Sequence, residues 1–479
     1  MTHRFTRRKT WSASLVISLL VPAIGAGTAM AQSQPAGDQQ PADQQPADQQ
    51  PADQQAANQQ PADQQAPPGN PDQPEAQPPP AQPALPPGTT PVLSRPSTLF
   101  PAMGPSNELV LGENFFIRPG VMLQSWTELL QDRAVQTDGD DGGYQMNTFL
   151  RRARIFFAGG IFKKMTFLLL FEAANLGKTL TAPDGTATKN YNSLIFQDAL
   201  LSFNLHPAFQ LQAGLMLVPF CRNILMSTAT YTTLDILTTS ATYLAATGTS
   251  NLRDTGVALK GQVLADRLEY RLGFFQGIRQ NSPQEGAQGG KNPFRFAGYV
   301  QYDFLDPETG YVFNGMYFGK KKVAGVSGGF DYQKADGNDV DAYWAASAAA
   351  FASIPLNGAN KAGGDEVDAL VQFLHFDPGT TLALPPAGIA KQNDIAGELG
   401  YYNKGIGGSV FGKFELRTHD DVMFEGGDLR IFGGGLKYFV AESAANFTLA
   451  FNRIESPNAP EEAVNPVNQV VLQIQLAYY

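Results

Sequence analysis

The stretch NTFLRRARIFFAGG, from Asn147 to Gly160, decides the fold class. Successive side chains of a β-strand point to opposite faces, so Arg152 and Arg154 share one face. The other face is apolar and carries Ala153, Ile155 and Phe157. A soluble sheet would bury the apolar face and expose the arginines to water. A membrane barrel would instead turn the apolar face to lipid and the arginines to a water-filled lumen.

The first 31 residues have the pattern of a secretory signal peptide. Arg4, Arg7, Arg8 and Lys9 form a basic region, which precedes the apolar run WSASLVISLLVPAIGAG. The sequence Ala29-Met30-Ala31 then fits a cleavage site of the small-x-small type. We therefore expect export, with the signal peptide cleaved off.

Residues 32–105 are predicted to be a disordered periplasmic linker. The repeat QQPAD and the following PPPAQPALPPG offer almost no apolar side chains to bury, so this segment cannot offset the entropy of ordering. Composition alone fits a passive spacer, while binding of peptidoglycan is an alternative role. The remaining residues, 106–479, are predicted to form a single barrel domain.

Within residues 106–479 no apolar run reaches the length of about 20 residues that a membrane helix needs. Alternating segments recur instead, which is the period of a strand. In MTFLLLFEA, Phe167 and Leu169 oppose Thr166 and Glu172. The segments SLIFQDALLSFNL, FQLQAGLML, LEYRLGFFQ, FGKFELRTH and QVVLQIQLAYY repeat the pattern.

The connections between these segments alternate between long and short. Long polar ones, such as QDRAVQTDGDDGGYQ and GIRQNSPQEGAQGGKN, take turns with short ones, such as NLHPAF and LADR. Outer-membrane barrels have this asymmetry of long outer loops and short periplasmic turns. We predict an all-β, transmembrane, antiparallel barrel of sixteen strands in the outer membrane of a Gram-negative-type cell. The stretch DPETGYVFNGMYFGKKK (residues 306–322) is predicted to be a long periplasmic turn rather than a strand.

Composition narrows the choice of partners. The formal net charge is −10, which suits neither a nucleic acid nor an anionic membrane surface. Cys221 is the single cysteine of the chain, so no intrachain disulfide can form. A barrel of about sixteen strands is wide enough for an aqueous channel, so its outer face meets lipid and its lumen meets small hydrophilic solutes.

The sequence also resembles a known family. The segments FLRRARIFFAGGIF, DALLSFNLHPAFQLQAGLMLVPF and RDTGVALKGQ are similar to the phosphate-selective porin O and P family, over roughly residues 110–479. The resemblance implies an anion-preferring channel of sixteen strands, usually trimeric, whose third long loop folds into the lumen. That loop would be Pro219 to Leu252, which is independently the longest connection. The loop has one basic residue, Arg222, and also contains the acidic Asp235, so it departs from an anion-selective design.

The polar strand faces, together with this loop, give a set of predicted pore-lining residues. These are Arg118, Arg152, Arg154, Glu172, Asp198, Arg222, Lys260, Arg271, Arg295, Lys413 and Arg417. Further carboxylates predicted in the lumen are Glu128, Glu269, Asp303 and Glu415. Because both signs occur, we expect only a weak preference for anions.

Motifs for enzymes and cofactors are weak. Gly325 to Gly329 matches G-x-S-x-G, but a strand follows where a nucleophile elbow needs a helix. The four histidines lie far apart and have no cysteine partners for zinc, while DGNDVD (residues 336–341) lacks the closing Glu of a calcium loop. We expect no enzyme and no cofactor. The sequence favours a passive diffusion channel, and the alternative is a structural barrel that anchors to the cell wall or a partner through its linker or loops.

Overall fold

A computed structural model describes the chain from residue 109 onward, with gaps. The described residues are 109–111, 114–132, 143–162, 164–181, 187–191, 194–247, 251–278, 293–334, 341–379, 389–420, 427–458 and 466–478. The predicted signal peptide, the predicted linker and most of the DGNDVD stretch lie outside them.

The described residues form one large antiparallel sheet of seventeen strands. Strand β1 (Leu109–Val110) pairs with β2 over two residues and lies outside the ring, which leaves sixteen wall strands. The wall strands are β2 (Phe115–Asp132), β3 (Gly143–Ile161), β4 (Met165–Leu176), β7 (Ile195–His206), β8 (Phe209–Leu217), β9 (Arg253–Val263), β10 (Leu268–Phe275), β11 (Arg295–Asp303), β12 (Val323–Gln333), β13 (Tyr343–Pro355), β14 (Glu366–Asp377), β15 (Gln392–Asn403), β16 (Gly408–His419), β17 (Leu429–Ala441), β18 (Ala445–Glu455) and β19 (Val467–Tyr478).

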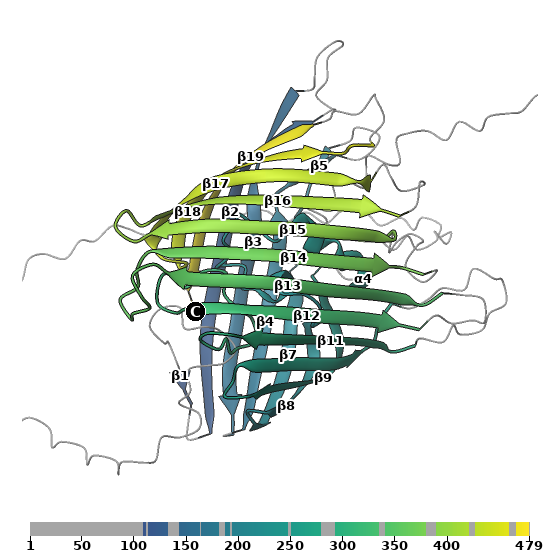
Figure 1. The fold of residues 1–479 in the computed structure, drawn as a ribbon, viewed down its shortest axis with the longest axis vertical. Coiled ribbons are helices and arrows are strands. Elements are labelled where there is room, and N and C mark those ends of the chain that lie inside the picture. Colours follow the sequence, from purple (N-terminus) through teal and green to yellow (C-terminus); the bar gives the residue numbers. More distant parts are fainter. Residues whose placement is uncertain are drawn as a thin grey trace, which may run out of the picture. The chain divides into compact units, whose positions relative to one another are not determined.

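The ring closes because the last strand pairs with the first wall strand. Strand β19 runs antiparallel to β2 from the pair Gln469 and Leu130 to the pair Tyr478 and Val121. Every other wall strand pairs with its neighbours in sequence, and in Figure 1 strands β12 to β17 cross in front of β2, β3, β4 and β7. The predicted sixteen-stranded antiparallel barrel is therefore confirmed. In the described part of the chain, no helix is long and apolar enough to cross a membrane.

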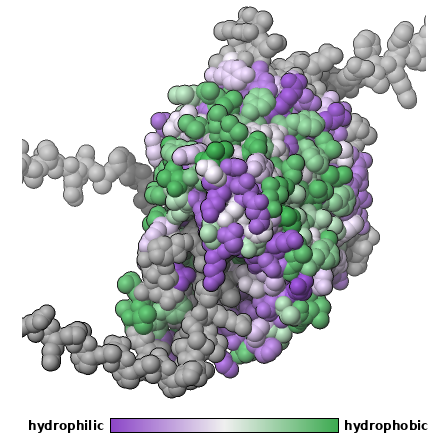
Figure 2. All heavy atoms as spheres, turned by 60° about the vertical axis from the view of Figure 1, so that its left-hand side comes forward, coloured by the Kyte–Doolittle hydropathy of each residue, from purple (hydrophilic) through white to green (hydrophobic). Residues whose placement is uncertain are grey.

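Alternation in sequence becomes an outer and an inner face. In β19 the side chains of Leu472, Ile474 and Leu476 are exposed, whereas Gln473 and Gln475 are buried inside. Neighbouring strands contribute further apolar side chains to the outer face, and Figure 2 shows hydrophobic residues spread over much of the side of the barrel. This outer face suits contact with lipid tails.

Strand β3 confirms the two faces predicted from its sequence, with one addition. Arg152 and Arg154 are buried on the inner side, and Ile155 is exposed on the outer side. The pairing with β2 shifts register between Gln124 and Ser125, which leaves Arg151 as an extra residue in a β-bulge. The bulge turns Arg151 inward as well, against simple alternation.

The two ends of the barrel differ in their connections. One end has short links at residues 162–164, 207–208, 264–267 and 404–407, and the other has longer ones, including residues 177–194 and 218–252. The first of these longer connections holds a small hairpin of β5 (Thr179–Thr181) and β6 (Ala187–Lys189). The second is the predicted third loop, Pro219–Leu252, and it contains η3 (Asn223–Leu225), α3 (Thr238–Ala241) and α4 (Tyr243–Thr247).

A long connection also starts at the short-link end. Residues 304–322, between β11 and β12, form no strand beyond one isolated bridge at Phe313, as predicted. Their position was not predicted, because Gly310 to Met316 are all buried instead of lying outside the barrel. We call Phe304–Lys322 the inserted segment.

Candidate channel lumen

The third loop lies against the inner wall at strands β12 and β13. The carbonyl of Phe220 accepts a hydrogen bond of 2.6 Å from the Ser347 hydroxyl. A Cβ on Gly329 would come within 1.8 Å of that carbonyl oxygen, so glycine is required for this close approach. The ring of Phe220 stacks on Tyr243, with ring centroids 4.4 Å apart.

From there the loop contacts the wall most of the way around the barrel. Polar contacts reach Gln372 on β14, Glu398 on β15, Glu415 on β16, Lys437 on β17, Gln475 on β19 and Gln124 on β2. Thr239 donates two hydrogen bonds to the Glu415 carboxylate, from its backbone N–H at 2.8 Å and from its hydroxyl at 3.1 Å. Such contacts on opposite walls place the loop inside the barrel, as the sequence predicted.

Apolar packing fills much of the space beside the loop. Leu225, Leu237 and Tyr243 belong to a large buried cluster that includes side chains of β3, β4, β12 and β14. Leu234 joins a second cluster with Trp126, Phe149, Phe411, Ala450 and Val471. The loop thus packs against both sides of the lumen.

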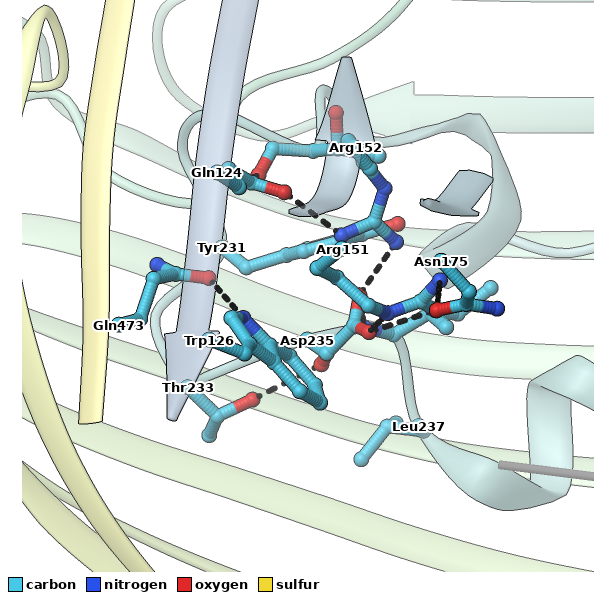
Figure 3. A network of polar contacts seen from close by, with 12 residues as sticks. Gln124, Trp126, Arg151, Arg152, Asn175, Tyr231, Thr233, Asp235, Leu237 and Gln473 are labelled. Carbon is cyan, nitrogen blue, oxygen red and sulfur yellow. Dashed lines mark hydrogen bonds and ion pairs between the residues drawn. The ribbon is translucent and has the colours of Figure 1, made fainter. Parts of the chain in front are cut away.

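Two arginines of β3, Arg151 and Arg152, meet one carboxylate of the loop, Asp235 (Figure 3). Asp235 pairs with Arg151 at 2.8 Å and with Arg152 at 2.5 Å. Arg152 also donates to the side-chain oxygen of Gln124 at 2.8 Å. Arg154 pairs with Glu172 at 3.0 Å and donates to the Thr228 hydroxyl at 2.6 Å.

The electrostatics of this cluster keep Asp235 ionised. Burial alone would raise the pKa of the Asp235 carboxyl, but Arg151 and Arg152 outweigh it and lower the pKa below the usual range. Tyr231, buried nearby, has its pKa raised by burial against the opposing effect of Arg152. The loop is therefore held to β3 by charge as well as by packing.

A second group of predicted pore-lining residues is buried in ion pairs. Arg222 pairs with Glu308 at 2.7 Å, and Arg253 pairs with Asp198 at 3.0 Å. The remaining pairs of this group, Lys260 and Arg271 with Glu269 and Arg295 with Asp331, are likewise buried. The expectation that these inward-facing cations line open water is not met here, because the third loop and the inserted segment cover them.

The other predicted residues keep some contact with solvent. Arg118 is 9% exposed, and the side chains of Lys413 and Arg417 are each 10% exposed. Lys413 pairs with Glu415 at 2.7 Å, and Arg417 lies 3.6 Å from Asp394. Of the further predicted carboxylates, Glu128 pairs with Lys178 at 3.1 Å and Asp303 accepts from the backbone N–H of Glu308 at 2.8 Å.

Four ion pairs of the lumen share an asymmetry, which the two pairs of Asp235 with Arg151 and Arg152 do not show. In the pairs Lys178–Glu128, Arg154–Glu172, Lys413–Glu415 and Arg417–Asp394, the cation is the more exposed partner. Its side chain is 10–12% exposed, whereas the carboxylate is at most 6% exposed. A solute at this surface would therefore meet the ammonium and guanidinium groups first.

Sequence reasoning missed several residues that shape the lumen. Arg151 was assigned no role because its inward direction depends on the bulge. Glu308 and Tyr311 were placed in a turn outside the barrel, although Tyr311 donates to Asp198 at 2.7 Å. The signal for Glu308 and Tyr311 was present in the sequence, because residues 306–322 contain four aromatic residues, Tyr311, Phe313, Tyr317 and Phe318. Among the described residues, no group of three His, Cys, Asp or Glu side chains forms a metal site.

Comparison with known proteins identifies the fold. No protein-family model and no curated protein matches this sequence. Among solved structures, the high-pH structure of OprB from Pseudomonas putida is similar with a TM-score of 0.51 and 7% identity, covering 76% of this chain and 94% of that one.

Two further similar structures have lower scores. The outer membrane channel DcaP of Acinetobacter baumannii has a TM-score of 0.47 and 10% identity, with 76% of this chain and 98% of that one covered. OmpF of Salmonella typhi in complex with daunomycin has a TM-score of 0.46 and 13% identity, with 78% and 100% covered. Identities this low concern the fold alone. The chain thus has the fold of a porin-like, sixteen-stranded antiparallel β-barrel.

Proposed function

We propose that this chain is an outer-membrane porin that lets small hydrophilic solutes diffuse passively, with a weak preference for anions. One observation supports the preference, namely the greater exposure of the cation in four lumen ion pairs, Lys178–Glu128, Arg154–Glu172, Lys413–Glu415 and Arg417–Asp394. Small inorganic anions of the phosphate class are the natural solutes for such a surface, in line with the sequence resemblance. A preference of this kind stays weak because every cation also has a carboxylate neighbour.

A homotrimer is part of the proposal. This part of the proposal rests on the sequence resemblance. A role of the linker in binding peptidoglycan likewise remains a proposal that rests on its position before the barrel.

A structural barrel is the second candidate function, and a specific observation favours it. The third loop and the inserted segment fill much of the lumen with buried side chains, among them Phe220, Tyr243 and Phe313. A barrel with a filled lumen could serve only as an anchor. Conductance of the mature protein in planar bilayers separates the two functions, because a channel gives stepwise currents and an anchor gives none.

Ion selectivity is tested by replacing Arg152 and Arg154 together with Gln. The reversal potential under a KCl gradient should show a lower chloride-to-potassium permeability ratio than wild type. Low ionic strength is preferable, because charges are screened beyond about 10 Å at 0.1 M salt. The matched control replaces Arg430 and Arg453, which are exposed outside the lumen, and should leave the ratio unchanged. Cation selectivity in wild type would contradict the anion preference.

A further inference from the structure

The inserted segment enters the barrel from the end opposite to the third loop. It follows β11 and precedes β12, at the end where the short links lie. Its outer residues Asp306, Lys320 and Lys322 are exposed, whereas Gly310 to Met316 are buried. The inserted segment therefore has exposed ends and a buried middle part, Gly310–Met316, which we call its tip.

The tip contacts the third loop directly. Phe313 donates its backbone N–H to the carbonyl of Leu225 at 2.8 Å, and its own carbonyl accepts from the N–H of Ser227 at 2.7 Å. These two bonds form a single parallel bridge between Met226 and Phe313. Close by, the Tyr311 hydroxyl accepts from the N–H of Leu217 at 2.7 Å.

One ion pair stabilises the contact between the tip and the third loop, which we call the junction. The two terminal guanidinium nitrogens of Arg222, Nη1 and Nη2, donate to the carboxylate of Glu308 at 2.7 and 3.1 Å. The Tyr317 hydroxyl and the amide of Gln301 donate to the same carboxylate. Arg222 also lies over the ring of Phe351, 3.4 Å from the centroid. Burial would lower the pKa of Arg222, but Glu308 outweighs burial and raises it, so the pair stays charged.

The wall holds the inserted segment on both sides of its tip. The carbonyl of Gly310 accepts from Lys260 and Arg271. Farther along, the Glu366 carboxylate accepts the backbone N–H groups of Tyr317, Phe318 and Gly319, at 2.7 to 3.1 Å. Breaking the contact between tip and loop would leave these wall contacts intact.

We infer that the inserted segment is a gate, which closes the lumen from the short-link end by docking on the third loop through Glu308 and Arg222. The inference rests on the proposed channel function. Two segments that enter from opposite ends and bond at their tips form a partition across the lumen. The two segments are joined by one bridge, one ion pair and the hydrogen bonds of Gly315 with Thr230 and Thr232, none of which belongs to the sheet, so the partition can open there without disturbing the wall. Solutes then pass when the tips separate.

The first test releases the junction. Glu308→Gln keeps the shape of the side chain but removes the charge that Arg222 needs, so the gate should open more often. We expect a higher open probability in planar bilayers than wild type. Cys221, adjacent to Arg222, is buried and its pKa is raised to about 12, so its thiol should react slowly with maleimide in wild type and faster in Glu308→Gln. The control Glu442→Gln breaks the exposed pair with Lys320 and should change neither readout.

The second test locks the junction. Paired Cα atoms across a β-bridge lie about 5 Å apart, which suits a disulfide. Met226→Cys with Phe313→Cys, in a Cys221→Ala background, should therefore cross-link when oxidised. Oxidation should suppress the current, and a reductant should restore it. Folding of each variant is verified by its heat-dependent shift in gel mobility.

The outcomes separate the gate from the channel function. If the wild type conducts and oxidation of the double-cysteine variant leaves its current unchanged, the gate is overturned and the channel function stands. A silent wild type with a conducting Glu308→Gln variant supports the gate and contradicts unregulated diffusion. Silence of both, in folded barrels, overturns the gate and the channel function together.

Discussion

At the scale of single residues, Asp235 is the carboxylate on which the position of the third loop depends. It is shared by Arg151 and Arg152, two like charges on the same stretch of β3. Without Asp235, Arg151 would lose its carboxylate partner, and Arg152 would keep only a contact of 3.9 Å with Glu172. A buried pair that loses one partner is strongly destabilised, because the remaining charge is uncompensated.

Asp235→Asn should therefore lower the free energy of unfolding at neutral pH by about 3 kcal/mol. The pKa of Asp235 is lowered in the folded state, so its stabilisation is complete above the ordinary pKa and is lost as the pH falls toward the folded value. The difference between wild type and variant should shrink below about pH 4. Urea denaturation in detergent at several pH values measures it. A difference that is constant from neutral pH to pH 3 would show that the charge of Asp235 is not responsible.

Prediction from sequence succeeded at residues that obey alternation and failed at those that do not. Arg152, Arg154 and Glu172 were assigned to the inner face because the strand period fixes their direction. Arg151 lies one position away and also points inward, since a bulge adds one residue to β3. A bulge follows from the pairing of two strands, so the sequence of one strand does not reveal it.

At the scale of elements, connection length and composition carried different amounts of information. The third loop was expected inside the barrel because it is long, has few charges and is rich in Thr, Ala and Leu, and it does lie there. The inserted segment was expected outside, although its aromatic residues Tyr311, Phe313 and Tyr317 need a place to be buried. Composition therefore indicated burial of both segments. The burial of the inserted segment was missed because the segment was assumed to be an ordinary periplasmic turn.

The fit between the third loop and the wall can be tested at Gly329. A Cβ at this position would clash with the backbone of Phe220, which cannot rotate away as a side chain could. Gly329→Ala should displace the loop, lower the stability by about 1–3 kcal/mol and speed the reaction of Cys221 with maleimide. Gly328→Ala is the matched control, since its Cβ would meet its nearest atom at 3.5 Å, an ordinary contact. Equal stability and equal labelling of both variants would mean that the loop does not rest on this wall.

At the scale of the whole molecule, the barrel depends on the closure of its ring. Each wall strand is hydrogen-bonded on both edges, and the pair β2–β19 joins residues more than 300 positions apart in sequence. The apolar outer face offers no water to unpaired backbone groups, so an open edge in lipid costs several kcal/mol for each unpaired group. Sequence alternation predicts strands one at a time, and only their even number and the loop rhythm suggested that the ends meet.

Removal of β19, residues 467–479, should consequently abolish the folded barrel rather than leave one with fifteen strands. The edges of β18 and β2 would both lose their partners, and fifteen antiparallel strands cannot close with the first and last antiparallel. The heat-dependent shift in gel mobility and resistance to protease should both disappear. As the control, Leu109→Gly with Val110→Gly weakens β1, which pairs with β2 over two residues outside the ring, and should leave both properties intact. A truncated chain that still shows the mobility shift would demonstrate that the ring can close without its last strand.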